Sequence, residues 1–126
     1  MMPTAPLDFA GLAETLRGVT VEVIGEGALG SGVLWPRGCV VTNAHVVRQP
    51  RVAVRSAGGG RFETRLVASD RKADLAVLRL VGGDLATAVL ATGAARVGSL
   101  VVAVGHPFGI RGALTAGIVH AIGKTA

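Results

Sequence analysis

The stretch VVTNAHVV, residues 40–47, places a histidine inside an otherwise apolar run. Its β-branched start predicts a strand, and the pair TN before His45 is typical of a turn that ends a strand. Such an ending presents the imidazole at a rim of the fold instead of in its interior. Twenty-nine residues after His45, Asp74 opens the apolar stretch DLAVLRL, residues 74–80, in a similar setting. We therefore consider the two stretches together.

The composition favours a single, mostly β domain. A chain of 126 residues can bury roughly two thirds of its unfolded surface, which is enough for one core without disulfides or metals. Half of the residues are hydrophobic, 19 are glycine and only 3% are aromatic. This balance predicts short β-branched strands joined by glycine turns, and it argues against a helical bundle.

Alternation of apolar and polar residues begins at Val19 and predicts about six short antiparallel strands up to Leu80. Their segments are VTVEV, VLW, CVVT, RVAVR, RFETRLVAS and DLAVLRL. The segment GEGALGSG before VLW is interpreted as a glycine turn. Short strands with short connections indicate a small barrel or sandwich, not a parallel sheet with crossover helices.

The segments on either side complete the predicted organisation. Residues 8–17 predict a helix with Asp8 as its N-cap. One face of this helix carries Phe9, Leu12, Ala13 and Leu16. Towards the C-terminus, SLVVAV predicts a strand, GHPFGIRG a loop, and ALTAGIVHAIG two further strand segments. The sequence thus divides into a lead-in helix (1–18), a first β-barrel (19–95) and the opening strands of a second, incomplete barrel (96–126).

Charge and cysteine content argue against several classes of function. Thirteen basic residues outnumber eight acidic ones, but they form no run of five and do not alternate with aromatic residues, so no nucleic-acid partner is predicted. The single cysteine, Cys39, is interpreted as a small buried apolar residue, and three widely spaced histidines form no zinc pattern. No stretch approaches 18 unbroken apolar residues, so no membrane span is predicted.

His45 and Asp74 are the candidate catalytic residues. A histidine at a strand end is often a hydrogen-bonded structural residue, and an aspartate at a strand start often accepts only a turn N–H. Taken together, the two residues point to a sharper hypothesis. Asp74 would accept the hydrogen bond of one ring nitrogen of His45, so that the other nitrogen can take a proton from a nucleophile.

Three blocks of sequence resemble the trypsin-like domain of the HtrA/Deg serine proteases, in the same order and over about residues 14–126. They are GSGVLWPRGCVVTNAHVV, DRKADLAVLRL and RVGSLVVAVGHPFGIRGALTAGIVHAIG. The resemblance implies an all-β fold, a trypsin-like double β-barrel whose first barrel is complete here and whose second is only begun. It also implies that His45 and Asp74 are the histidine and aspartate of a His-Asp-Ser triad. No metal or organic cofactor is expected, because the chemistry is acyl transfer to a hydroxyl and then to water.

The nucleophile of that family lies in a GNSGGP-type segment, which these 126 residues do not contain. The four serines are Ser31, Ser56, Ser69 and Ser99. Ser31 lies between glycines, but it matches an early strand of the family and lacks the following glycines whose N–H groups would form an oxyanion hole. We therefore expect this chain by itself to be inactive.

Three further residues are assigned no catalytic role. Cys39 is a strand-interior thiol with no activating neighbour in the pattern. His106 in GHPF is interpreted as a surface or loop-packing residue. His120 follows GIV and is predicted to face solvent from a strand.

Two functions from different classes remain. The first is a serine endopeptidase domain that acts on unfolded polypeptides. The alternative is a degenerate, non-catalytic protease domain that binds polypeptide strands or partner subunits through open sheet edges. Because a half-built barrel leaves unpaired edges, a completing polypeptide or a homo-oligomer is expected. The start MMPTAPLDF lacks the basic region of a signal peptide, which makes the cytoplasm the default location, although members of the family are commonly exported.

Overall fold

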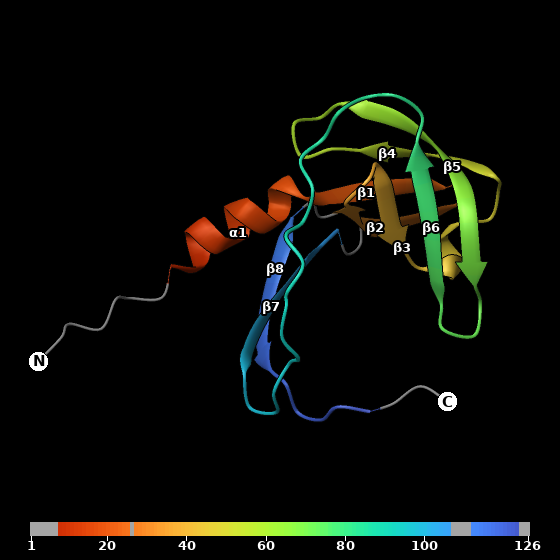
Figure 1. Cartoon of the computed structure of the whole chain (residues 1–126). Helices are drawn as coiled ribbons and strands as arrows, with labels where there is room; N and C mark the ends of the chain where they lie inside the picture. The colour runs from red at the N-terminus through yellow and green to blue at the C-terminus, as the bar shows by residue number, and fades with distance from the viewer. Residues whose placement is uncertain (1–7, 26, 107–111, 124–126) are drawn as a thin grey trace, which may run out of the picture.

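The computed structural model describes residues 8–25, 27–106 and 112–123 and is mostly β (Figure 1). One helix, α1 (Phe9–Gly18), precedes a closed barrel of six antiparallel strands, and a two-stranded sheet follows. The barrel strands are β1 (Thr20–Gly25), β2 (Ala28–Trp35), β3 (Cys39–Thr42), β4 (Arg51–Arg55), β5 (Arg61–Asp70) and β6 (Leu75–Leu80). The later sheet contains β7 (Leu100–Gly105) and β8 (Ala113–Ile118). The predicted all-β class with a short N-terminal helix is confirmed.

Helix α1 begins at the predicted cap. The Asp8 carboxylate accepts a hydrogen bond of 2.9 Å from the backbone N–H of Gly11, which satisfies one of the free donors of the first turn. The predicted apolar face is only partly covered, because Ala13 is buried whereas Phe9 and Leu12 remain exposed. The helix ends directly before β1, so it leads into the barrel as the sequence indicates.

Buried valines and leucines fill the barrel, whose strands follow the order β1-β2-β3-β6-β5-β4. The core residues are Val21, Val23, Leu34, Val40, Val46, Val52, Val54 and Leu78. Alternate side chains of β1 face the barrel core, as the sequence pattern predicts. Thr20 and Glu22 on the outer face of this strand are nevertheless buried as well. They are covered because α1 and β7 both pack against β1.

The interpretation of the whole segment GEGALGSG as a turn is wrong, because β2 begins at Ala28 and its residues 28–33 pair with all of β1. A Cβ on Gly32 would lie 2.7 Å from a methyl group of Val40, and one on Gly30 would lie 2.6 Å from a methyl group of Val46. These glycines leave room for core valines. In a sequence, a glycine required by packing in a strand looks the same as a glycine required by a turn.

Pairing between β3 and β6 joins the two stretches that carry His45 and Asp74. The strands are antiparallel, with Val40 opposite Leu78 and Thr42 opposite Ala76. The C-terminal end of β3 therefore lies beside the N-terminal end of β6, at one end of the barrel (Figure 1). Residues just after β3 and just before β6 meet there.

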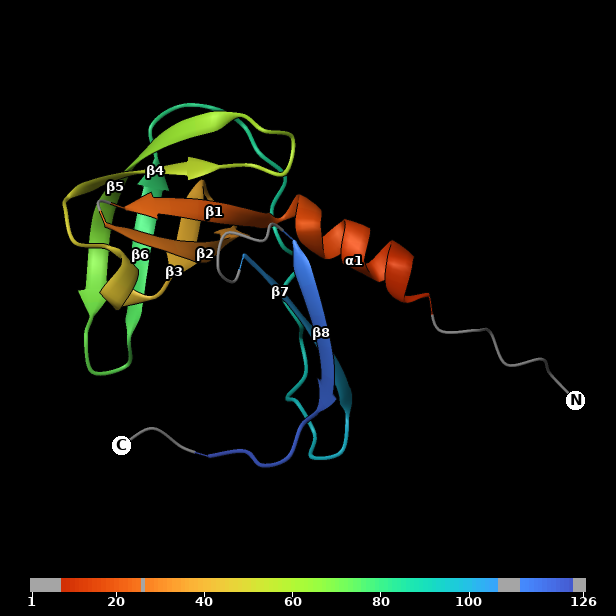
Figure 2. The same cartoon turned by 180° about the vertical axis from the view of Figure 1, so that it is seen from behind.

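The sheet of β7 and β8 lies beside the barrel, close to α1 (Figure 2). The backbone N–H of His106 donates to Ser31 Oγ at 2.7 Å, and Arg17 Nε donates to the carbonyl of Gly112 at 2.8 Å. These bonds connect the end of β7 and the start of β8 to β2 and α1.

The prediction of two strand segments in ALTAGIVHAIG is wrong, because β8 ends at Ile118 and residues 119–123 form no strand. An apolar run becomes a strand only where a partner strand is present, and residues 120–123 have none in the described chain. Most of the predicted loop GHPFGIRG lies outside the described residues, and the domain boundaries at 18/19 and 95/96 stay predictions. In the described ranges, no helix combines the length and hydropathy needed to cross a membrane.

Candidate active site

His45 lies in a single turn of 3-10 helix, η1 (Ala44–Val46), that follows β3 directly. Asn43 is the N-cap of this turn, so the strand ends at the predicted place. Ala44 and Val46 on either side are buried, and they fix the turn against the barrel. The side chain of His45 itself is 70% exposed. The imidazole is thus held at the rim and is open to a reacting group.

Asp74 lies at the end of the turn between β5 and β6, in a backbone conformation unusual for a residue with a side chain. Its φ is +56°, in the left-handed region, and its N–H donates to the carbonyl of Arg71 at 3.3 Å. This conformation costs about 1–2 kcal/mol for most L-residues, and aspartate is among those that adopt it most readily. The strained backbone directs the carboxylate towards η1.

The carboxylate of Asp74 makes two contacts with His45. Oδ2 lies 2.7 Å from Nδ1 of the ring, and Oδ1 accepts a hydrogen bond of 2.9 Å from the backbone N–H. The contact with the backbone N–H fixes the carboxylate beside η1, and the contact with Nδ1 orients the ring. The structure therefore brings together the two residues that the sequence selects, and Nε2 is the ring nitrogen not used by Asp74.

Hydrogen bonds from His45 hold the pKa of the Asp74 carboxyl below its ordinary value of 3.8. The backbone N–H of His45 has the largest effect, followed by the hydrogen bond from the ring, while partial desolvation acts in the opposite direction. Asp74 is therefore ionised at neutral pH and can act as the acceptor of a hydrogen bond from Nδ1–H of the ring.

An open hollow of about 350 Å³ lies beside the pair. Its lining residues are Ala44, His45, Val47, Arg48, Arg71 and Asp74. Arg48 and Arg71 are the functional candidates that sequence reasoning missed, because it counted both among scattered surface arginines. The only available signal was their closeness in sequence to His45 and Asp74. No serine lines this hollow in the part of the chain that the structure describes.

The residues that were assigned no catalytic role occupy structural positions. Ser31 belongs to β2, and its hydroxyl accepts the hydrogen bond from His106. Cys39 is only half-buried at the start of β3, so the prediction that it is a buried apolar residue is wrong. The reason is its place at the strand end, next to the turn that contains Arg37. His120 is exposed as predicted, but it lies beyond β8 and not in a strand.

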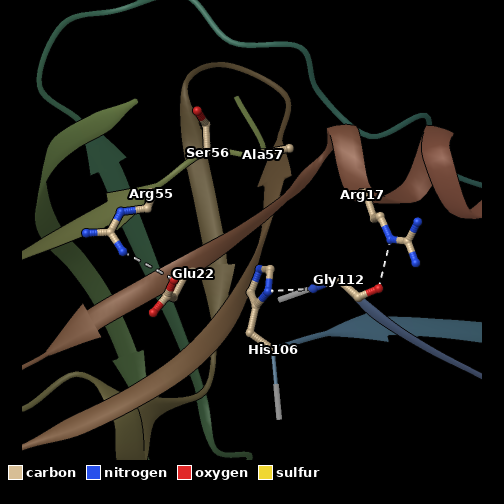
Figure 3. Close-up of a pocket in the computed structure, with 7 residues that line it drawn as sticks. All are labelled: Arg17, Glu22, Arg55, Ser56, Ala57, His106 and Gly112. Carbon is tan, nitrogen blue, oxygen red and sulfur yellow. Dashed lines mark hydrogen bonds and ion pairs between the residues drawn. The ribbon is translucent and has the colours of Figure 1, made fainter. Parts of the chain in front are cut away.

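A second, smaller cavity of about 120 Å³ lies between the barrel, α1 and the β7–β8 sheet (Figure 3). His106 lines it, and its Nδ1 accepts a hydrogen bond of 3.0 Å from the N–H of Gly112. On the opposite side, Glu22 is 7% exposed and its carboxylate lies 3.6 Å from Arg55 Nη1. The contact with Gly112 agrees with the prediction of a loop-packing role for His106.

Comparison with known proteins supports the same assignment of fold and family. A family model described as a trypsin-like peptidase domain matches residues 30–126. The periplasmic pH-dependent serine endoprotease DegQ of Escherichia coli (strain K12) is 37% identical over 102 residues, which cover 77% of this chain and 22% of DegQ. The periplasmic serine endoprotease DegP of Salmonella typhimurium is 41% identical over 103 residues, which cover 78% of this chain and 22% of DegP.

A third relative, the serine endoprotease DegS of Haemophilus influenzae, is 37% identical over 101 residues, which cover 78% of this chain and 30% of DegS. The chain thus spans less than a third of the length of these relatives. Among solved structures, the serine endoprotease from Yersinia pestis superposes with a TM-score of 0.85 at 28% identity, over 95% of this chain and 47% of that chain. Since the family match covers most of the sequence and the barrel superposes closely, the chain belongs to the trypsin-like peptidases, as a domain of the HtrA/Deg type.

Proposed function

We propose that His45 and Asp74 are the general base and its orienting carboxylate in a serine endopeptidase active site. The observation that carries this proposal is the 2.7 Å contact between His45 Nδ1 and Asp74 Oδ2, at an exposed rim of the barrel. A base must lie at hydrogen-bond distance from its orienting group and remain accessible to substrate, and this pair meets both requirements.

In this proposal the ionised Asp74 holds neutral His45 as the tautomer with its proton on Nδ1. Nε2 then accepts the proton of a serine hydroxyl while the serine oxygen bonds to the carbonyl carbon of the substrate. The imidazolium returns that proton to the amine as the C–N bond breaks, which leaves an acyl-enzyme. In the second half-reaction, His45 takes a proton from a water molecule whose oxygen bonds to the acyl carbon. The proton then passes to the serine oxygen as the ester bond breaks, which releases the acid. Asp74 stays ionised throughout.

The hydroxyl nucleophile must come from outside these 126 residues. The Ser31 hydroxyl accepts a hydrogen bond from the backbone N–H of His106, and none of the other serines lies in a segment of the GNSGGP type. Loss of the serine alone from a Ser-His-Asp set costs about 10⁶-fold in kcat. We therefore propose that these 126 residues alone do not hydrolyse peptides, and that residues outside them supply the nucleophile.

Unfolded polypeptide is the proposed substrate. The comparisons support this class because the relatives are named serine endoproteases, whose substrates are polypeptides. A hollow that is open to solvent beside His45 fits an extended chain better than a small enclosed molecule.

The test joins this chain to the segment that follows the matched region in Escherichia coli DegQ, so that the relative supplies the nucleophile. Casein hydrolysis and labelling by a fluorophosphonate probe are measured for the fusion and for this chain alone. We expect activity only in the fusion, and a loss of about 10⁶-fold in kcat for His45→Gln. His120→Gln is the matched control, because His120 is an exposed histidine that does not line the hollow.

Two results would contradict the proposal. One is a His45→Gln fusion that hydrolyses casein as fast as the parent fusion. The other is covalent labelling of one of the four serines in the isolated chain, since it would show that a nucleophile is present after all.

A non-catalytic strand-binding module is the second candidate, and the exposed β7–β8 sheet favours it. Leu100, Val101 and Ile118 each keep 45–64% of their surface exposed, and the sheet has two strands in the described residues. An added strand could pair with an unpaired edge of this sheet. Binding of unfolded casein to this chain, measured by fluorescence anisotropy, should then be weakened by Val101→Lys and unchanged by His45→Gln. Unchanged binding in the Val101→Lys variant would count against the module.

A further inference from the structure

Asn43 connects the two loops that carry the proposed base and its carboxylate. Its side-chain amide nitrogen donates a hydrogen bond of 2.9 Å to the backbone carbonyl of Asp74, 31 residues further along the chain. Asn43 comes before η1, and Asp74 comes before β6. The contact therefore spans the gap between the ends of β3 and β6.

The side chain of Asn43 does not cap η1, although Asn43 occupies the N-cap position. Asparagine at an N-cap usually accepts a hydrogen bond from a backbone N–H of its own helix. Here η1 has Asn43 as its N-cap but shows no side-chain capping bond. The side chain reaches instead across to the loop of Asp74, which indicates that it acts on Asp74 and not on η1.

The conformation of Asp74 explains why a constraint at its carbonyl matters. Its φ of +56° is in the left-handed region, and the turn's own hydrogen bond, from its N–H to Arg71, is long at 3.3 Å. A hydrogen bond on the carbonyl side restricts the peptide plane that follows Asp74. With the backbone fixed in this way, the carboxylate can keep Oδ1 on the N–H of His45 and Oδ2 on its ring.

We infer that Asn43 is a positioning residue for the catalytic pair, which it supports by holding the peptide of Asp74 and not by touching substrate. The inference rests on the proposed function, in which Asp74 must orient His45. Because Asn43 is exposed, its hydrogen bond competes with water and adds little to global stability. Its removal should therefore disturb the contacts between Asp74 and His45 while the free energy of unfolding changes little.

The experiment uses the full chain and compares Asn43→Ala with Thr42→Val. Thr42 is the matched control because its hydroxyl donates to the Ser31 carbonyl at 2.7 Å, so its loss weakens the neighbouring strand without touching Asp74. Nuclear magnetic resonance measures the pKa of the Asp74 carboxyl and the exchange of the His45 Nδ1 proton with water. Urea denaturation measures stability in parallel.

In Asn43→Ala we expect the pKa of Asp74 to rise towards its ordinary value and the Nδ1 proton to exchange about 2- to 10-fold faster, the range for loss of one hydrogen bond. Thr42→Val should lower stability and leave both signals unchanged. Asn43→Asp, which keeps the shape but has no donor, should accelerate exchange as alanine does, and Asn43→Gln should restore part of the protection.

The inference is overturned if Asn43→Ala and Asn43→Asp are folded and show wild-type proton exchange, or if Thr42→Val produces the same change. Failure of the proposed function is a separate result, namely activity in the His45→Gln fusion. It would not alter proton exchange measured in this chain without a nucleophile. In the active fusion, Asn43→Ala should lower kcat and leave KM unchanged.

Discussion

Replacing Gly32 by alanine should destabilise the barrel, although alanine is usually better than glycine in a strand. The added Cβ would lie 2.7 Å from Val40 Cγ1, 3.1 Å from Val23 Cγ2 and 3.2 Å from Val21 Cγ2. All three valines are fully buried, so none of them can move into solvent. Overpacking costs about 1–3 kcal/mol, and the removal of a strand glycine offsets about 0.5–1 kcal/mol of it. Because all three contacts are shorter than an ordinary van der Waals contact, the upper part of the overpacking range applies, about 2–3 kcal/mol, and the free energy of unfolding should fall by about 1–2.5 kcal/mol.

Urea denaturation measures this change, followed by the fluorescence of Trp35, the single tryptophan, which is the last residue of the barrel strand β2. Gly117→Ala is the matched control, because Gly117 also lies in a strand and a Cβ there would meet no atom within 4 Å. Its free energy of unfolding should stay constant or rise by up to about 1 kcal/mol. The two substitutions are chemically identical, so a difference between them reports the packing around each site.

A double-mutant cycle with Val40→Ala shows whether crowding is the cause. Val40→Ala removes the methyl group nearest to the added Cβ, so Gly32→Ala should cost at least about 0.5 kcal/mol less in that background. The reasoning is refuted if Gly32→Ala leaves the free energy of unfolding within about 0.5 kcal/mol of wild type, which is the usual range for surface changes. An identical cost in both backgrounds would refute it equally.

Three further predictions concern the carboxylate, the helix cap and the contact between sheets. Because the pKa of Asp74 is lowered in the folded state, its ionised form contributes stability that is fully present above pH 3.8 and is lost as the pH falls through the folded pKa. In Asp74→Asn, the urea midpoint should therefore fall less steeply with decreasing pH below 3.8 than in the wild type. An equal slope in the two proteins would contradict this. Asp8→Ala removes the cap bond to Gly11 and should lower the free energy of unfolding by about 1 kcal/mol, measured by urea denaturation with far-ultraviolet circular dichroism. Ser31→Ala removes the acceptor of the His106 N–H, and hydrogen exchange at that amide should become about 5-fold faster. Wild-type exchange there would show that the hydroxyl does not hold β7.

Much of the barrel is predictable from local patterns. The alternating segments RVAVR and RFETRLVAS become β4 and β5, joined by the glycine hairpin SAGGG, because side-chain period and turn residues act over a few positions. Asp8 caps α1 for the same local reason. The prediction fails at β2, where Gly30 and Gly32 are strand residues whose small size is required by valines distant in sequence.

The candidate site shows the same division between local and long-range information. The pattern TNAH indicates where a strand ends, and the family resemblance selects His45 and Asp74. The sequence shows neither the left-handed backbone of Asp74 nor the amide of Asn43 on its carbonyl. Apart from their closeness in sequence to His45 and Asp74, nothing in it indicates that Arg48 and Arg71 line one hollow, since Arg48 follows η1 and Arg71 lies between β5 and β6.

The sequence by itself determined most of the barrel strands and the N-terminal helix, because periodicity and capping are properties of neighbouring residues, and its family resemblance selected His45 and Asp74 as the candidate pair. Only the tertiary structure decided that the ends of β3 and β6 lie side by side, through the register that sets Thr42 opposite Ala76. That register brings the ring and the carboxylate to 2.7 Å. The physical reason is that strand pairing depends on the burial of the whole valine core, to which residues far apart in the chain contribute at once.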